Sequence, residues 1–431
     1  MTMGKTWTNW AGNQRATPQT WVKPNNLEEI AAAVREASAQ GRKVKVIGSG
    51  HSFTGAAVAQ GVLVDLSHMY RVVSEPNEDG VVEVEAGITL STLNEYLFSQ
   101  GRALQNLGDI SYQTVSGAIS TGTHGTGVHI GGLAQQVVGL TLVDGQGNIV
   151  EINEEDALLH FVRVGVGALG IIGHVKIRTV PKFALHVEEK PMRLSFVLDN
   201  LEDLVSRNNH FEFFWIPHTK WALTKQNNRT DLPLAPIPSL KKWWQKSFME
   251  NTAFGMVCRL GKLFPALIPR LATALPGSGS TSYVDESFRV FASERKVKFV
   301  EMEYAIPYEH CRSAIEDIER VISEKNYKVS FPVEVRFTAG DDNVLSTAHA
   351  RQSAYIAVHM FKGSDYGSYF ASVAEIMAKY EGRPHWGKMH FLSNEQLSCL
   401  YPRWAEFLAV RDQLDPQRTF HNDYLDQVFG K

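Results

Sequence analysis

The stretch Val44-Lys45-Val46-Ile47-Gly48-Ser49-Gly50-His51-Ser52-Phe53-Thr54 decides the fold of this chain. Its first four residues are apolar except for Lys45, which predicts a buried strand that ends at Gly48. The two glycines lack a Cβ, so the backbone N–H groups of the loop can approach a phosphate closely. His51 and Ser52 follow where such phosphates would lie, which makes this loop a candidate cofactor site. A surface loop with a solvated histidine is the alternative, and this stretch alone leaves both open.

Composition limits the class of protein. A length of 431 residues suggests two or three domains at roughly 150 residues each. Hydrophobic residues at 44% and charged residues at 21% are typical of a soluble globular protein, and a formal charge of −3 argues against a nucleic-acid partner. No secretion signal or long uncharged apolar run is visible, so we expect a cytoplasmic protein. Cys258, Cys311 and Cys399 are far apart, which predicts buried free thiols and no metal site.

The first 181 residues are expected to form an α+β domain. Short segments with helical and with strand periodicity alternate there, and they do not fit a regular doubly wound sheet. The predicted helices cover residues 26–40 and 89–100, and the predicted strands cover residues 61–66, 81–87, 137–143, 149–152 and 171–180.

A loop rich in Gly, Ser and Thr covers residues 106–132 and contains Thr121-Gly122-Thr123-His124-Gly125-Thr126-Gly127. A loop of this length inside a domain usually carries function, because its polar backbone needs partners that a ligand can supply. Small residues with hydroxyl groups between them would suit a buried pyrophosphate and the edge of a flat ring. A flexible linker is the alternative.

A dinucleotide fingerprint is present by its letters, Gly165-Val166-Gly167-Ala168-Leu169-Gly170. That motif needs a strand before it and a helix after it. Here a helix is predicted at 155–164 and a strand at 171–180, which is the reverse order. We therefore interpret the glycines as helix-to-sheet packing or as a second close approach of the backbone to an extended cofactor.

Residues 182–405 contain longer amphipathic segments and many aromatic residues. Residues 236–275 include Lys241-Lys242-Trp243-Trp244, a pattern typical of a helix anchored at a membrane surface. Prolines at 265 and 269 break the apolar stripe, so we favour a helix packed on this domain. The predicted strands cover residues 211–217, 297–306, 333–337 and 355–359, and the predicted helices cover residues 308–324 and 367–380.

Three short segments of this second region carry ionisable groups. On the strand at 333–337, Glu334 and Arg336 share one face and lie about 7 Å apart along the chain. This pattern indicates either a polar site or a surface ion pair. On the strand at 355–359, His359 shares a side with Tyr355, although a lone core histidine would be unremarkable. The third segment is a rigid turn, Arg383-Pro384-His385-Trp386-Gly387-Lys388.

Taken together, these segments resemble the vanillyl-alcohol-oxidase flavoprotein superfamily, and within it the sugar-lactone and alditol oxidase branch. The resemblance covers nearly the whole chain. It implies a PCMH-type two-subdomain FAD-binding domain at 1–181, an α+β substrate or cap domain with an antiparallel sheet at 182–405, and a C-terminal segment at 406–431 that returns to the FAD domain. Five motifs carry it in this order: Gly48–Ser52, Ser116–Gly127, Gly167–Gly170, Glu334–Arg336 and His385–Lys388.

The resemblance also implies a cofactor, FAD, bonded covalently through His51 to the 8α carbon of the flavin. Such a bond withdraws electron density from the ring and raises its potential. The residues that would bind the cofactor are Gly48, Ser49, Gly50, His51, Ser52, Phe53, Gly108, Asp109, Thr114, Ser116, Gly117, Thr121, Thr123, His124, Gly127, Ile172, His385 and Lys388.

The activity implied is oxidation of an aldono-1,4-lactone such as L-gulono-1,4-lactone. The catalytic residues would be Glu334, Arg336, His359 and Lys388. Our hypothesis is hydride transfer from the substrate C2–H to flavin N5, with the hydroxyl proton lost to His359, Glu334 or water. The cations would stabilise the negative charge that develops on the flavin.

Four alternatives remain at this stage. An alditol oxidase that acts on xylitol- or sorbitol-type polyols would share the same loops. Gly108 lies where relatives gate oxygen, and its small size favours an oxidase over a dehydrogenase that uses another acceptor. A carbohydrate-binding protein without chemistry is disfavoured by the intact His51, Arg336 and Lys388. A metal hydrolase is disfavoured too, because no His-x-His or His-Glu-x-x-His motif occurs among the 15 histidines.

Overall fold

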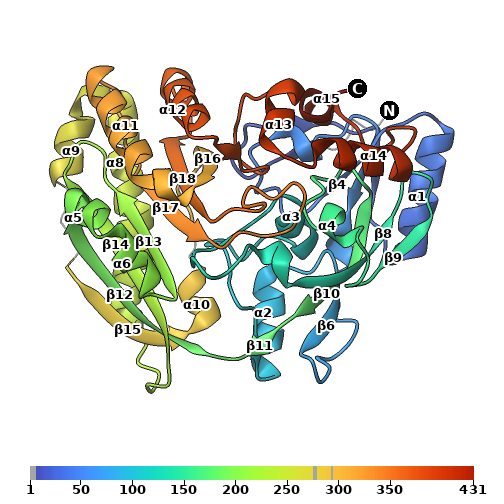
Figure 1. Cartoon of the computed structure of the whole chain (residues 1–431), viewed down its shortest axis with the longest axis horizontal. Coiled ribbons are helices and arrows are strands. Elements are labelled where there is room, and N and C mark those ends of the chain that lie inside the picture. Colours follow the sequence, from blue (N-terminus) through green and yellow to red (C-terminus); the bar gives the residue numbers. More distant parts are fainter. Residues whose placement is uncertain (1–5, 275–278, 293–294) are drawn as a thin grey trace.

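The strands of the chain gather into two groups, which lie on opposite sides of the molecule in Figure 1. The computed structural model describes residues 6–274, 279–292 and 295–431. The first group consists of two small sheets from the N-terminal half, and the second is one large antiparallel sheet. Two short pairs complete the strands: β1 (Trp7–Thr8) with β2 (Arg15–Ala16), and β7 (Arg102–Ala103) with β11 (Val180–Pro181).

The smallest of the three main sheets is parallel and contains the decisive stretch. Helix α1 (Leu27–Ala39) packs beside it with Ile30 and Val34 fully buried, and Asn26 caps the helix by accepting the N–H of Glu29 at 2.9 Å. The strand order of this parallel sheet is β3 (Thr20–Val22), β5 (Val62–Asp65) and β4 (Val44–Ile47). The glycine loop begins where β4 ends.

The second sheet is antiparallel and packs against the first through a shared core. All seven residues of its strand β8 (Val137–Val143) are buried. Helix α2 (Leu90–Ser99) contributes Leu93 and Leu97 to the same core. The strand order is β6 (Val81–Glu85), β10 (Ile171–Arg178), β8 (Val137–Val143) and β9 (Ile149–Ile152).

Two predictions for this half are wrong in detail. The helix expected at 155–164 is only one turn, α4 (Leu159–Val162), because Asp156 accepts the N–H of Asn153 and holds the preceding residues in a turn. The loop expected at 106–132 contains a short helix, α3 (Val115–Ser120), capped by Thr114. Rejection of the dinucleotide fingerprint is confirmed, because β10 begins directly after Gly170.

The large sheet has eight strands, and its two faces differ in chemistry. Side chains alternate along each strand, so one face carries the apolar residues and the other the charged ones. Helices α5 (Leu194–Asp199), α6 (Leu201–Ser206), α11 (Cys311–Glu324) and α12 (Gly367–Lys379) share the apolar core. The strand order is β15 (Thr281–Glu286), β12 (Ala184–Arg193), β14 (Trp221–Thr230), β13 (His210–Trp215), β17 (Val333–Thr338), β18 (Ser353–Phe361), β16 (Phe299–Pro307) and β19 (Arg383–Pro384).

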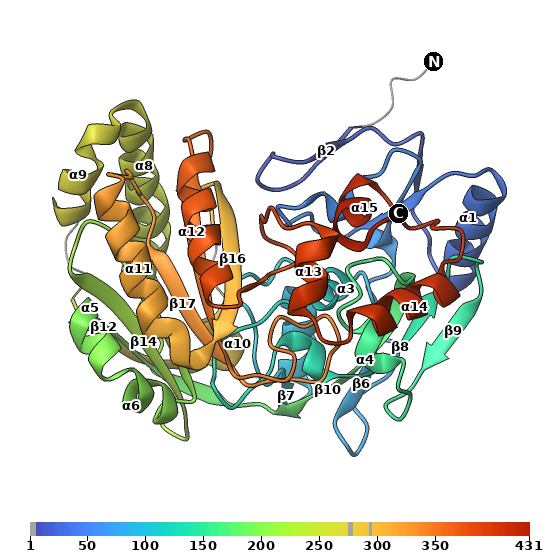
Figure 2. The ribbon, with the colours of Figure 1, turned by 45° about the horizontal axis from the view of Figure 1, so that its top comes forward.

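The last part of the chain crosses back to the first half, as Figure 2 shows for α13 (Asn394–Leu400), α14 (Trp404–Leu414) and α15 (Asp423–Phe429). Buried side chains from Trp386 onward share the core of the two small sheets. The N–H of Val44 donates to the carbonyl of Thr419 at 2.8 Å, which ties β4 to this return. The domain boundaries at residues 181 and 405 stay a prediction.

The described part of the segment at 236–275 is a series of short helices. Its members are α7 (Ser239–Lys242), a π-helical stretch (Trp243–Ala253), α8 (Phe254–Leu263) and α9 (Ile268–Ala274). Phe254 packs against Phe331 with ring centroids 4.9 Å apart, which seats α8 on the large-sheet half. Among the described residues, no helix is both long and apolar enough to cross a bilayer.

The other predicted helices and strands are confirmed, with ends shifted by a few residues. All three cysteines are free, as expected. Cys258 and Cys311 are buried, whereas Cys399 is exposed on α13, so the expectation of burial is wrong for that residue. A short helix leaves one side in water, and sequence alone did not reveal which side Cys399 would occupy.

Candidate active site

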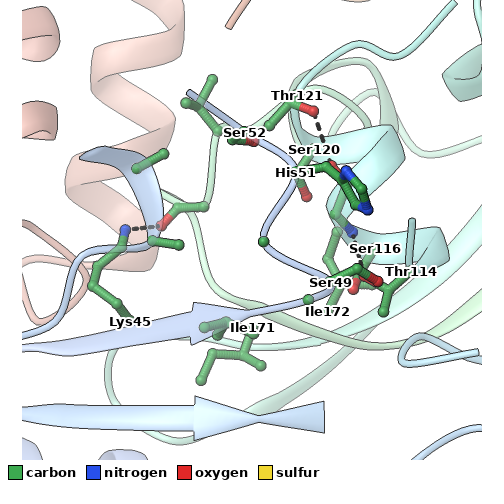
Figure 3. A pocket seen from close by; sticks show the side chains of 18 of the residues that line it. Lys45, Ser49, His51, Ser52, Thr114, Ser116, Ser120, Thr121, Ile171 and Ile172 are labelled. Carbon is green, nitrogen blue, oxygen red and sulfur yellow. Dashed lines mark hydrogen bonds between the residues drawn. The ribbon is translucent and has the colours of Figure 1, made fainter. Parts of the chain in front are cut away.

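A groove of about 960 Å³ runs along the glycine loop between the two small sheets. Its walls come from the end of β4 and the following loop, from α3, and from the start of β10 (Figure 3). Ten of the predicted cofactor residues line it: Gly48, Ser49, Gly50, His51, Ser52, Thr114, Ser116, Gly117, Thr121 and Ile172.

The glycine loop fits an extended anionic group. Within the described part of the chain, the backbone N–H groups of Ser49 to Ser52 donate no hydrogen bond to protein, so a ligand or water must accept from them. Gly50 has a φ of 70°, which a residue with a Cβ rarely adopts. A Cβ at Gly48 would lie 2.2 Å from Thr114 Oγ1, so only glycine permits this approach to the capping residue of α3.

His51 stands at the end of the groove that faces the large sheet. Its ring stacks on Trp10 with centroids 5.8 Å apart. Burial, and then the positive charge of Lys388, lower the pKa of His51, so the imidazole is neutral and has a free lone pair at neutral pH. Two hydrogen bonds, from Phe53 N–H to the Gly387 carbonyl and from Thr54 Oγ1 to the Trp386 carbonyl, tie its loop to the turn that carries Lys388.

Beneath the groove, Lys45 holds three segments together. Its Nζ donates to the carbonyls of Gly167 at 3.1 Å and Phe420 at 2.9 Å, and Figure 3 shows it at the far side of the groove from His51. Burial lowers the pKa of Lys45 to about 7. The one polar residue of the predicted strand thus joins β4, the Gly165–Gly170 turn and the C-terminal segment.

Beyond His51, the charged face of the large sheet presents Arg336 at the centre of a carboxylate group. Arg336 bonds to Glu212 at 2.9 Å, lies 3.7 Å from Asp109 and contacts Glu334. Arg295 shares Asp109 at 2.6 Å. These side chains come from β13, β17 and two loops, and buried charges of this kind require partners.

Glu334 is the carboxyl group of this cluster that is least able to stay ionised. Burial raises its pKa to about 7, because Arg336, which favours the ionised form, is shared with two other carboxylates. A carboxyl group that titrates near neutral pH is suited to accept a proton from a substrate.

A second charged cluster lies two strands further along the same face. Lys388 Nζ contacts Glu301, and His359 Nε2 lies 3.4 Å from the other oxygen of that carboxylate. Burial opposes the charge of Lys388, but Glu301 and then Glu303 outweigh it and raise the Lys388 pKa. Lys388 is therefore a cation at neutral pH.

Next to them, His124, Glu303 and His385 place one possible ligand atom each within 4.8 Å of one another. His385 Nδ1 accepts the N–H of Gly387 at 3.0 Å, so the proton of the neutral ring sits on Nε2 and leaves no lone pair for a metal. Glu303 instead pairs with His124 at 3.2 Å, and the His124 ring stacks on Tyr355 at 3.6 Å. This geometry supports a polar network rather than a metal centre.

The remaining predicted cofactor residues lie between the groove and the charged face. Phe53 is buried, with its ring 5.9 Å from that of Phe299. A Cβ at Gly108 would lie 3.1 Å from Thr123 Cγ2 and 3.2 Å from the His124 carbonyl, so these three residues are adjacent. Gly127 donates its N–H to the Phe337 carbonyl at 2.7 Å and thereby joins the α3 loop to β17.

Sequence reasoning missed Glu212, Glu301 and Glu303. Each is an acidic residue inside a strand of otherwise apolar character, Phe211–Trp215 or Phe299–Pro307. In register, Glu301 lies opposite His359 and Glu303 opposite Ala357, while Glu334 also lies opposite Ala357. The alternation of these acids was a usable signal, but the pairing of their strands was not visible in the sequence.

Comparisons with known proteins agree on the class of fold and chemistry. Residues 18–153 match the family model of an FAD binding domain, and residues 175–428 match that of D-arabinono-1,4-lactone oxidase. The L-gulono-1,4-lactone dehydrogenase of Mycobacterium tuberculosis is 41% identical over 99% of this chain and 100% of its own. The L-gulonolactone oxidase of Bos taurus is 34% identical over 98% of this chain and 97% of its own. A solved structure of a solvent-stable cholesterol oxidase aligns with a TM-score of 0.83 at 16% identity, over 99% of this chain and 97% of that one.

The approach of Gly48 to Thr114 generates a prediction. Gly48→Ala forces Thr114 away from the groove at a cost of about 1–3 kcal/mol, and we expect FAD binding to weaken about tenfold to a hundredfold. The ratio of flavin to protein absorbance, measured with both proteins in the His51→Ala background so that no tether retains the flavin, reports this. Gly279→Ala is the matched control, because a Cβ there meets nothing within 4 Å. Equal FAD content in Gly48→Ala and the parent contradicts the close approach.

Proposed function

The chain belongs to the D-arabinono-1,4-lactone oxidase family, and from that premise we propose that it is an FAD-dependent enzyme that oxidises an aldono-1,4-lactone. One observation carries the proposal. A glycine-lined groove contains a neutral His51, and the charges that act on His51 are those of Lys388 and of Asp109, which lies beside Arg336 and Glu334 on the buried sheet face. This juxtaposition suits a flat redox ring on one side and a small polyhydroxy substrate on the other.

FAD would lie along the groove, with the unpartnered N–H groups of Ser49 to Ser52 available for its phosphates. When bound, FAD supplies the acceptor for a hydride from the lactone C2. His51 would hold it by a covalent bond from the neutral imidazole to the 8α carbon.

The substrate would be held and deprotonated by the charged face. Arg336 and Lys388 are cations at neutral pH and would bind lactone oxygens and stabilise developing negative charge. Glu334 would accept the proton of the C2 hydroxyl, since its pKa near 7 lets it serve as a base. Charged groups that are already in place orient the substrate without a rearrangement of the site.

The proposal extends to the electron acceptor and to the cell compartment. Glycine at position 108 carries no side chain that could block dioxygen, which supports an oxidase, and a separate electron acceptor is the alternative. A cytoplasmic location stays a prediction, as does the absence of a nucleic-acid partner.

The test of the proposed function is turnover by the purified holoenzyme with a dye acceptor, on L-gulono-1,4-lactone and on xylitol. We expect kcat/KM to be at least about a hundredfold higher for the lactone, because a site built to bind a carbonyl and ring oxygens leaves charged groups unpaired with a polyol. Hydrogen peroxide formation under air reports the use of dioxygen. Faster turnover of xylitol would make the alditol oxidase the correct assignment.

The tether at His51 has its own prediction. After acid denaturation, the parent pellet is expected to stay yellow, whereas His51→Ala releases its pigment and turns over the lactone about tenfold more slowly, a barrier change of about 1.4 kcal/mol. The exposed His129→Ala is the control and should keep its colour. Release of all pigment from the denatured parent rules out a covalent bond.

Glu334 generates a prediction of pH dependence. A base must be ionised, and burial raises the pKa of Glu334 to about 7, so kcat/KM should rise with pH through that value and level off above it. Glu334→Gln is expected to lower kcat/KM by about 10²–10⁴-fold and to remove this rise. Glu316→Gln, on the exposed side of α11, is the control. A parent profile that is flat between pH 5.5 and 8.5 would contradict the assignment.

A further inference from the structure

We propose that Glu301 is a positioning residue, which holds the Lys388 ammonium and the His359 ring side by side on the charged face of the large sheet. The proposal rests on the proposed function, because it deepens the account of the same site. Glu301 makes no part of the groove and was not predicted as a site residue.

The geometry of β16 places one carboxylate between Lys388 and His359. Glu301 lies opposite His359 in the antiparallel register of β16 and β18, and its Oε1 is 3.4 Å from His359 Nε2. Its other oxygen contacts Lys388 Nζ. The Glu301 carbonyl accepts the N–H of Met389 at 2.9 Å, so the backbone of the turn that carries Lys388 is attached at the same residue.

Two contacts orient the His359 ring. Nδ1 lies 3.3 Å from the Pro332 carbonyl, and Nε2 faces the Glu301 carboxylate. Glu301 therefore fixes one edge of the ring beside Lys388.

Glu301 stays ionised in this position. Burial disfavours its charge, but Lys388 and then His359 outweigh burial and hold the pKa of Glu301 at about 2. The other charged groups nearby do not replace it. Glu303, on the same strand, is paired with His124 at 3.2 Å. Asp109, which also faces Lys388, is shared by Arg295 and Arg336.

The Lys388 ammonium is the cation that this arrangement holds in place. Glu301 contacts it directly, and the charges of Glu303 and Asp109 also act on it. His385, which adjoins Glu301 and Lys388, is neutral because burial lowers its pKa to about 4, and His51 is neutral as well. A Lys388 cation that is held in one position is available to the negative charge that develops during oxidation of the lactone.

The test compares the parent with Glu301→Gln, which keeps the size of the side chain and removes the charge, and with Glu301→Asp, which keeps the charge. Without the carboxylate, Lys388 should lose its proton at lower pH, because Glu301 is the largest of the charges that raise its pKa. We expect the alkaline limb of kcat for L-gulono-1,4-lactone to move down by about one pH unit or more in Glu301→Gln, with KM raised. Glu301→Asp should keep the parental limb. Glu316→Gln is the exposed control.

A readout without turnover separates this proposal from the proposed function. The nitrogen-15 NMR signal of Lys388 Nζ in the holoenzyme, assigned by its loss in Lys388→Met, should titrate at lower pH in Glu301→Gln than in the parent. An unchanged Lys388 titration and an unchanged pH limb in a folded Glu301→Gln overturn the role of Glu301. Failure of the parent to oxidise any lactone, with the NMR result as expected, overturns the proposed function alone.

Discussion

The pairing of β16, β17 and β18 is the constraint on which the charged face of the large sheet depends. Because neighbouring strands share their side-chain alternation, Glu301, Glu303, Glu334, Arg336 and His359 all project from one face of the large sheet. A slip of one residue in any of these pairings would send its charges into the apolar core beneath α11 and α12. The packing of that core therefore sets the register, and the register assembles the site.

The charged face is buried, so each of its charges needs a partner. An isolated carboxylate or guanidinium is very costly away from water, and each group here is therefore paired. Arg336 interacts with three carboxylates, whereas Glu301 lies between Lys388 and His359. In the first cluster Glu334 is short of compensation, and burial raises its pKa to about 7. In the second cluster Lys388 keeps its charge, because Glu301 and Glu303 raise its pKa. Proton acceptance and charge stabilisation therefore belong to different clusters of the same sheet face.

The groove and the pocket belong to different halves of the chain, and short loops hold them in contact. The turn that carries Lys388 is bonded to the loop after His51, and Gly127 is bonded to β17. The C-terminal segment is bonded to the other side of the groove. The Thr419 carbonyl accepts the N–H of Val44 on β4, and the Phe420 carbonyl accepts a hydrogen bond from Lys45 below the groove. A bound cofactor would thus be gripped by one half and face the charges of the other.

The sequence by itself determined the local features of this protein. The strand at Val44–Ile47, the glycine loop before His51, and the shared face of Glu334 and Arg336 follow from apolar periodicity and from the absence of a Cβ in glycine. The one-turn length of α4 and the exposure of Cys399 were not predicted, because turns and neighbours override weak propensities. Only the tertiary structure decided which carboxylate meets which cation. Glu301 and His359 are far apart along the chain, and they meet because long-range packing, rather than local preference, sets the register of their strands.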